Sequence, residues 1–202
     1  MTNSSITIRV LAILLLVNFG VIVLDQTAAQ ASGSANSFVI ALGPTPLPQG
    51  APNIGVNGYT ATDKVQRGRM VQMAVVMDIP HGYHVNSNRP LESFLKATQL
   101  TVETASGVRA SQVIYPRALL RKFSFSKNNL SVYEGRVVLR FNVVVPAGFR
   151  DGNLEVKAKL NYQSCSDSLC YPPQSREVRV GLPVVSGNDS VKRINGEIFA
   201  RR

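Results

Sequence analysis

The most regular alternation of apolar and polar residues in the chain is LEVKAKLNY, residues 154–162. Leucine, valine, alanine and tyrosine would share one face of a strand, while charged or amide side chains would occupy the other face. A period of two is typical of a β-strand with one buried and one solvated face. The stretch therefore predicts a β-strand with one face toward the core and the other toward solvent.

The same period recurs on both sides of this strand. Residues 136–145 and 176–182 alternate again, with valine, leucine and phenylalanine at the inward positions. Further apolar runs predict strands at 70–79, 99–104 and 108–115. Short strands separated by turn-rich loops are typical of an antiparallel β-sandwich. We therefore predict an all-β chain with this architecture.

Residues 1–31 have the pattern of a signal peptide. One cation, Arg9, precedes an apolar run at 10–24, and Ala29-Gln30-Ala31 matches an A-x-A cleavage site. The run is shorter than the roughly 20 residues that span a bilayer, so an uncleaved membrane anchor is the less favoured alternative. We predict a mature protein in the periplasm or otherwise outside the cytoplasm, without stable membrane insertion.

The rest of the chain divides by composition. Residues 32–58 are rich in proline and glycine, which predicts an extended arm or linker. The compact β-sandwich is predicted at 59–186. Residues 187–202 form a basic tail in which Asp189 could cap a short helix, although Gly196 makes a frayed end an equal alternative.

The chain is basic, with 22 Lys and Arg against 12 Asp and Glu and a net charge of +10. The basic residues are scattered and lack interleaved aromatic residues, so we expect no nucleic-acid partner. A solvated surface is the simplest explanation, and attraction to an anionic surface or acidic partner comes second. The sequence contains no hydrolase, nucleotide or cofactor motif, and we expect no cofactor.

The two cysteines of the chain, Cys165 and Cys170, follow the strand at 154–162 and precede the next predicted strand. A hairpin would bring them together, and an exported protein is expected to form the disulfide. Closing so short a loop destabilises the unfolded chain by only about 2 kcal/mol through lost entropy, so the bond would contribute little to the stability of the fold. It would, however, be open to an attacking thiolate. From spacing alone, a structural and a redox-active pair remain equally open.

The residues around the two cysteines limit the kind of redox chemistry that we expect from the pair. The spacing differs from the C-x-x-C of thioredoxin, and Asp167 between the cysteines would disfavour a thiolate. We therefore expect a carrier of electrons within specific complexes rather than a strong oxidant. A zinc site that combines the cysteines with His81 and His84 is disfavoured by their separation, and we predict no metal.

Several motifs together resemble one family. The stretch YQSCSDSLCYPP, residues 162–173, looks like the cysteine motif of the amino-terminal domain of DsbD, the thiol–disulfide interchange protein. The stretch HGYHVNSNRP, residues 81–90, resembles that family's "GWHINSNKP"-like segment. Tyr115-Pro116 and Tyr133-Glu134-Gly135 follow in the expected order. The resemblance extends from about Val65 to Leu182.

This resemblance implies an immunoglobulin-like antiparallel β-sandwich that exchanges disulfides with thioredoxin-like or DsbD-like proteins. In that family an aromatic residue on a flexible loop caps the disulfide, and residues 121–133 match this loop. The sequence does not choose between its two phenylalanines. Residues that would form or border the site are Cys165, Cys170, Phe123, Phe125, Tyr133, Asp167, Tyr162 and Tyr171.

Two departures from the family pattern affect these expectations. The proteobacterial form has one more residue between its cysteines, and this chain stops at Arg202 without transmembrane or thioredoxin domains. We therefore expect either a relay that works with partners in trans or a stand-alone domain that has lost the relay. The resemblance favours Cys170 as the partner-linked cysteine. The favoured hypothesis is a protein thiol–disulfide oxidoreductase. The alternative is a non-catalytic immunoglobulin-like binding or structural module with a structural disulfide.

Overall fold

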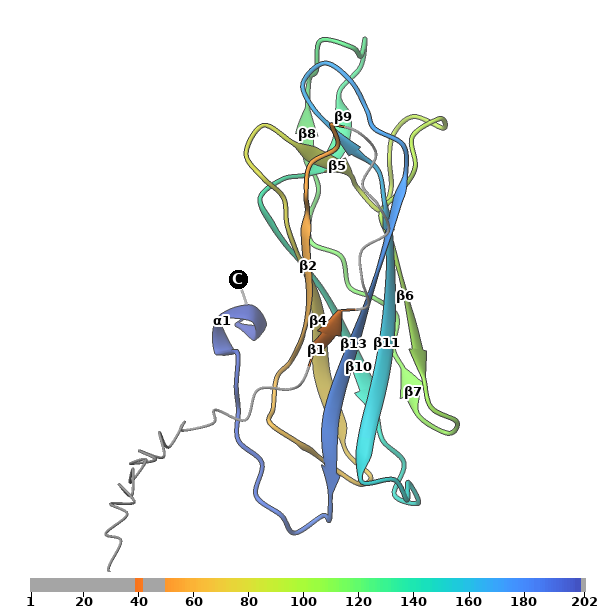
Figure 1. Ribbon diagram of the computed structural model, residues 1–202, viewed down its shortest axis with the longest axis vertical. Helices are drawn as coiled ribbons and strands as arrows, with labels where there is room; N and C mark the ends of the chain where they lie inside the picture. Colours follow the sequence, from red (N-terminus) through yellow and green to blue (C-terminus); the bar gives the residue numbers. More distant parts are fainter. Residues whose placement is uncertain (1–38, 42–49, 201–202) are drawn as a thin grey trace, which may run out of the picture. The chain divides into compact units, whose positions relative to one another are not determined.

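The computed structural model describes residues 39–41 and 50–200 of the chain (Figure 1). The first sheet has the strand order β1, β13, β11 and β6. Its strands are β1 (Val39–Ala41), β13 (Gln174–Val185), β11 (Asn153–Tyr162) and β6 (Gln99–Thr104), and the short β3 (Val65–Gln66) runs parallel to the end of β13. All other neighbours in this sheet are antiparallel.

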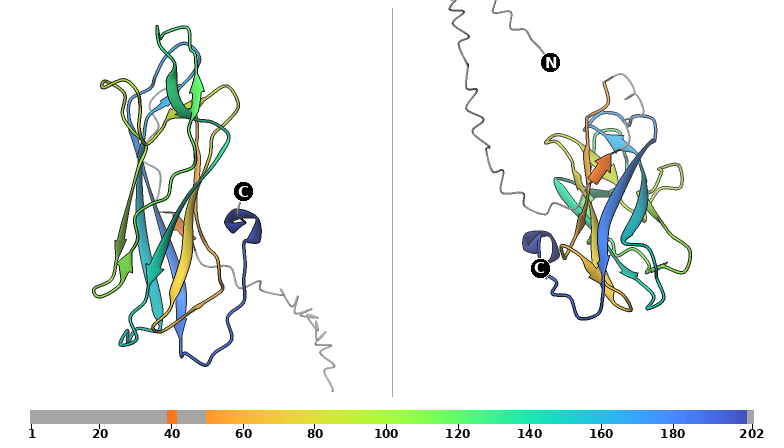
Figure 2. Two further views of the ribbon diagram at one scale, coloured as in Figure 1. Left: turned by 180° about the vertical axis from the view of Figure 1, so that it is seen from behind. Right: turned by 60° about the horizontal axis from the view of Figure 1, so that its bottom comes forward.

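The second sheet lies against the first (Figures 1 and 2). It has the order β2, β4, β10 and β7, with every neighbouring pair antiparallel. Its strands are β2 (Gly55–Thr60), β4 (Met70–Asp78), β10 (Arg136–Val144) and β7 (Arg109–Ala110). The two facing sheets confirm the prediction of an immunoglobulin-like antiparallel β-sandwich.

The core lies between these sheets and is built from the alternating positions of the long strands. In β11, Leu154, Val156, Ala158, Leu160 and Tyr162 are buried, and the residues between them are exposed or half-buried. Strand β10 alternates in the same way, so the predicted registers are confirmed. Period-two patterning therefore identifies the inward faces here because each strand buries one face only.

The two sheets approach closely at Gly58 of β2. A Cβ atom at this position would overlap Cγ2 of Val180 in β13. Glycine therefore lets β2 pack directly against the facing sheet, because any larger residue would have to displace the Val180 side chain.

A third sheet of short strands lies at one end of the sandwich (Figure 1). Its order is β12, β5, β9 and β8, and all its pairs are antiparallel. The strands are β12 (Ser164–Cys165), β5 (His84–Asn86), β9 (Leu130–Tyr133) and β8 (Leu119–Arg121). This sheet is what brings the cysteine segment next to parts of the chain that are distant in sequence.

The segment after β13 returns to the outer face of the second sheet. Helix α1 (Gly196–Phe199) buries Ile198 against Ala74 and Val76 of β4. Arg140 of β10 donates from Nε and Nη2 to the carbonyl oxygen of Ile198, at 3.2 and 2.5 Å. Both faces of β4 are therefore covered, which explains why its burial does not alternate.

One strand is shorter than predicted. Of residues 108–115, only Arg109 and Ala110 form a strand, and Ile114 makes an isolated bridge to Arg140. The Oγ atom of Ser111 accepts from the backbone N–H of Asn142, where a regular ladder would use a carbonyl. The side chain thus replaces a backbone partner and the segment leaves the sheet.

The predicted signal peptide, residues 1–31, lies outside the described residues, as do parts of the predicted arm and tail. Within the described part of the chain, no helix is long and apolar enough to cross a membrane.

Candidate functional site

The cysteines lie in the loop that joins β11 to β13. The last paired residues of this hairpin are Tyr162 and Gln174. Beyond them, Cys165 and Cys170 form a disulfide with their Cα atoms 3.9 Å apart. The pair therefore spans the mouth of the hairpin, as the sequence predicted.

Backbone hydrogen bonds hold the cysteine loop in shape. The N–H of Ser166 donates to the oxygen of Leu169 at 2.8 Å, and the N–H of Tyr171 donates to the oxygen of Ser164 at 2.9 Å. The Nε2 atom of Gln163 donates to the oxygen of Tyr171 at 3.1 Å. Oε1 of the same residue accepts from Asn86 Nδ2, which links the loop to β5. The loop is thus tied to the third sheet as well as to its own hairpin.

A histidine lies directly opposite the first cysteine. In the pairing of β12 with β5, Cys165 faces His84, and on its other side Cys165 bridges to Cys170. Directly opposed residues of antiparallel strands point to the same face of a sheet, with Cβ atoms about 5 Å apart. The side chains of His84, Cys165 and Cys170 therefore form one row across three segments.

The members of this row differ in exposure. His84 is 2% exposed and Cys165 is fully buried, whereas Cys170 is half-buried. An external thiolate must reach a sulfur along the S–S axis. Of the two cysteines, Cys170 is the one that solvent can reach.

Aromatic side chains from the loop between β8 and β9 stack on the histidine of this row. The ring of Phe123 stacks on His84, with centroids 3.9 Å apart and planes 16° apart. Phe125 stacks on the outer side, with its centroid 5.6 Å from Phe123 and 6.4 Å from His84. Phe123 is 9% exposed and Phe125 38%, so the first ring is the inner layer and the second the outer layer.

Apolar packing and three side-chain hydrogen bonds hold this loop, residues 122–129, in place. Phe123 packs in a small cluster with Leu95, Leu130 and Val132. The hydroxyl of Ser124 donates to the backbone oxygen of Asp167 at 2.7 Å, which joins the aromatic loop to the cysteine loop. Asn128 Nδ2 donates to Glu92 Oε1 at 2.8 Å. Lys122 Nζ also donates to the oxygen of Lys127 within the loop.

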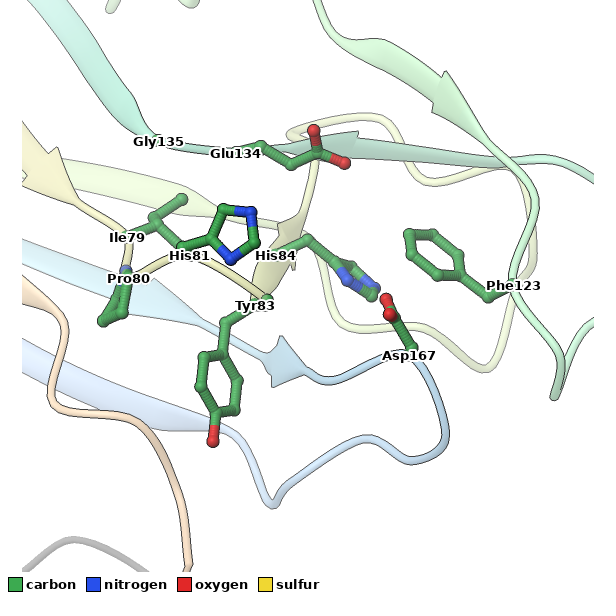
Figure 3. A pocket seen from close by; sticks show the side chains of 10 residues that line it. Ile79, Pro80, His81, Tyr83, His84, Phe123, Glu134, Gly135 and Asp167 are labelled. Carbon is green, nitrogen blue, oxygen red and sulfur yellow. The ribbon is translucent and has the colours of Figure 1, made fainter.

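A pocket of about 430 Å³ opens beside the histidine (Figure 3). His84 and Phe123 line it together with His81 and Tyr83, and the carboxylates of Glu134 and Asp167 border it from two other segments. Burial lowers the pKa of His84 below its ordinary value of 6.5, and the two carboxylates oppose that shift. The imidazole is therefore held neutral near neutral pH, yet it has counter-charges nearby for the protonated form. Its Nε2 is buried without a hydrogen-bond partner among the described residues.

The structure brings some predicted site residues together and separates others. Asp167 is exposed in the cysteine loop and touches the aromatic loop through its backbone. Tyr171 adjoins the loop, with its ring 6.3 Å from that of Tyr83. Tyr162 is buried at the end of β11, and its hydroxyl donates to Gln174 Oε1. Tyr133 is buried in β9 rather than in the aromatic loop, and its hydroxyl donates to Asn88 Oδ1.

Sequence reasoning missed the position of His84. It weighed this histidine only as a metal ligand alongside His81, which is exposed. No local pattern reveals the contact, because β5 and β12 are about eighty residues apart along the chain and meet only in the third sheet.

The chain resembles known proteins in the following respects. A family model described as "Thiol:disulfide interchange protein DsbD, N-terminal" matches residues 57–182. The reduced DsbD n-terminal domain of Neisseria meningitidis is 19% identical, with 68% of this chain and 88% of that chain covered and a TM-score of 0.39. The N-terminal periplasmic domain of ScsB from Proteus mirabilis is 14% identical, with 68% of this chain and 50% of that chain covered and a TM-score of 0.43. No curated protein matches the chain.

The family match covers more than half of the chain and contains most of the sandwich core and both cysteines. A disulfide-bonded pair within such a domain is consistent with thiol–disulfide exchange. The chain therefore belongs to the family of DsbD amino-terminal domains.

Proposed function

We propose that this chain is an exported thiol–disulfide exchange domain that relays electrons through Cys165 and Cys170. The observation that carries the proposal is the disulfide across a short loop in a chain of the DsbD amino-terminal family. Its partners would be thioredoxin-like or DsbD-like proteins that bind in trans. Such exchange needs no cofactor, because the electrons move with the sulfur–sulfur bonds.

The small size of the disulfide loop favours a role in thiol–disulfide exchange over a role in stabilising the fold. The cysteines are five positions apart, and the loop-entropy relation gives about 2 kcal/mol for so short a closure. The sandwich already has a continuous core from both sheets. The bond is thus a minor part of what holds the fold together, and its opening is compatible with a folded domain.

The exposures suggest a role for each cysteine. Half-buried Cys170 would form the mixed disulfide with the partner, because an incoming sulfur can approach it. Buried Cys165 would resolve that intermediate by attacking Cys170. In the resolving step the Cys165–Cys170 bond forms, the bond from Cys170 to the partner breaks, and the electron pair leaves on the partner's sulfur.

The aromatic loop would control access to the pair. Phe123 lies over His84 in the row that contains the cysteines, and Phe125 lies outside Phe123. An apolar cover of this kind excludes stray thiols until a partner displaces it. The Ser124 hydrogen bond to the cysteine loop would hold the cover closed between encounters.

Export completes the proposal. Residues 1–31 would act as a cleaved signal peptide that delivers the domain to the periplasm or another extracytoplasmic space, where disulfides form. We expect the protein isolated from its native envelope to begin at Ser32 by mass spectrometry. Intact protein that stays with membranes after a high-salt wash would contradict cleavage.

The exchange function is tested by the reduction potential of the pair. Structural disulfides have potentials below roughly −300 mV, so an exchanging pair should lie well above that value. The measurement is a glutathione or dithiothreitol titration of the purified domain, read by thiol alkylation. A Cys165→Ser variant should in addition trap a mixed disulfide through Cys170 with an extracytoplasmic thioredoxin-like protein. A potential in the structural range together with no trapped partner from Cys165→Ser or Cys170→Ser would instead support a non-catalytic module.

A further inference from the structure

We infer that His84 is the proton acceptor for Cys165 when that cysteine resolves a mixed disulfide. The inference rests on the proposed function and adds a third reacting side chain to the cysteine pair. It comes from the row of His84, Cys165 and Cys170, which lies across β5, β12 and the cysteine loop in the third sheet.

The first support is the placement of the imidazole. His84 is paired with Cys165 in the β5–β12 ladder, so both side chains project from the same face of the sheet as neighbours. Cys170 occupies the next place in the row. The imidazole is therefore adjacent to the cysteine that resolves and one position removed from the cysteine that meets the partner.

The second support is the isolation of Cys165 from bulk water. Its residue is fully buried, and Phe123 stacks on the histidine beside it. A thiol has an ordinary pKa of about 8.5 and reacts as the thiolate, so its proton must leave before attack. Bulk water reaches a fully buried residue only when the site opens, so it is a slow acceptor for this proton. A neighbouring base can accept it without such opening.

The third support is the state of the imidazole. Its Nε2 is buried and unpartnered within the described part of the chain, so it is free to take a proton. Burial lowers the pKa of His84, which keeps the ring in the neutral, proton-accepting form. The other titratable groups around the pocket are Glu134, Asp167, His81 and Tyr83. The two carboxylates would stabilise the imidazolium once it forms.

The resolving step then balances as follows. The neutral imidazole takes the proton from Cys165 Sγ, and the Cys165 electron pair forms the bond to Cys170 Sγ. The bond between Cys170 and the partner breaks, and the partner leaves as a thiolate. The imidazolium passes its proton through the pocket to the departing thiolate. The domain is oxidised to the disulfide and the partner is reduced to the thiol.

The test uses the reduced full-length chain and oxidised glutathione as the probe. Cys170 should first form a mixed disulfide with glutathione, and Cys165 should then release the second glutathione. Acid quenching and mass spectrometry follow the intermediate. We expect His84→Gln and His84→Phe to accumulate the mixed disulfide and to resolve it about 10²-fold more slowly near pH 7. The defect should shrink as the pH rises, because hydroxide can then remove the Cys165 proton whenever the site opens, and formation of the thiolate depends less on the imidazole.

The controls separate a proton-transfer role from a structural one. His84→Phe keeps a ring for Phe123 to stack on, and His81→Gln removes the exposed histidine of the same pocket and should behave as wild type. Wild-type resolution by both His84 variants, with an unchanged pH profile, would overturn the inference while leaving the exchange function intact. If the unaltered chain itself forms no mixed disulfide, the exchange function fails and the inference fails with it.

A measurement without substitution guards against variants that do not fold. The ring resonances of His84, followed by NMR in the unaltered protein, should show a step at the pH where a thiol ionises when the pair is reduced, and should lack that step when the pair is oxidised. The physical reason is that the charge of a Cys165 thiolate acts on a neighbouring imidazole. Absence of the step in the reduced protein would overturn the inference.

Discussion

Replacement of Phe123 by alanine should speed reduction of the disulfide by external thiols. The ring is 9% exposed, and burial of a phenylalanine contributes about 2–3 kcal/mol. Stacking on His84 adds about 1 kcal/mol. If the loop must open before a thiol enters, loss of roughly 3 kcal/mol from the closed state raises the open fraction about 10²-fold.

Substitutions at two other positions in the loop provide a comparison for the expected 10²-fold increase in the reduction rate. Phe125 is 38% exposed and its ring packs on the outer side of Phe123, so Phe125→Ala should change the rate much less. Ser124→Ala removes one hydrogen bond to the cysteine loop, worth about 1 kcal/mol, and should raise the rate about fivefold.

The assay is the pseudo-first-order reduction of the oxidised domain by dithiothreitol, with free thiols trapped by alkylation. A glutathione titration of the same variants gives the reduction potential. We expect the rates to rank Phe123→Ala above Ser124→Ala and Phe125→Ala, with the potential almost unchanged, because a cover controls access rather than equilibrium. Equal rates for wild type and Phe123→Ala, or a larger effect at Phe125, would refute this account of the loop.

Three further predictions concern the fold and its pH dependence. Leu160→Ala should lower the free energy of unfolding by about 2–5 kcal/mol in denaturant titrations, while Lys159→Ala should change it by less than about 0.5 kcal/mol; equal costs would mean that the β11 register is wrong. Gly58→Ala should destabilise the domain in the same assay because its methyl group overlaps a β13 side chain, whereas Gly55→Ala, with its nearest contact at 3.6 Å, should cost less. Burial lowers the pKa of His84, so below about pH 6.5 the unfolded chain binds more protons at this residue than the folded domain does. The free energy of unfolding should therefore fall as the pH drops through 6.5 toward the folded pKa, by at most about 1.4 kcal/mol per pH unit, and His84→Gln should flatten this slope.

The long strands were predictable because their information is local. In β11 and β10 one face meets the core and the other meets solvent, so the alternation of residue types records the structure directly. The cysteine pair was predictable for a similar reason, because its members are only five positions apart. A hairpin alone suffices to join them.

The third sheet, at the end of the sandwich, could not be predicted in the same way. Strands β12 and β5 have two and three residues, which is too short to show a period. Their pairing joins distant segments, so the contact of His84 with Cys165 has no local signal. The choice between Phe123 and Phe125 also depends on tertiary packing. Both are aromatic residues in one loop, and only the cluster with Leu130 and Val132 distinguishes the inner ring.

The closeness of the cysteines in sequence has a consequence for the order of events during biogenesis. A cellular oxidase can close this disulfide in a chain that has not yet folded, because bringing together residues five positions apart requires little chain entropy. The β5–β12 pairing closes a far longer loop and must wait for the sandwich. Formation of the Cys165–Cys170 disulfide therefore does not show that the chain has folded. A newly made chain can carry the bond before the loop with Phe123 and Phe125 is in place, and Phe123 reaches its position against His84 only when the third sheet assembles.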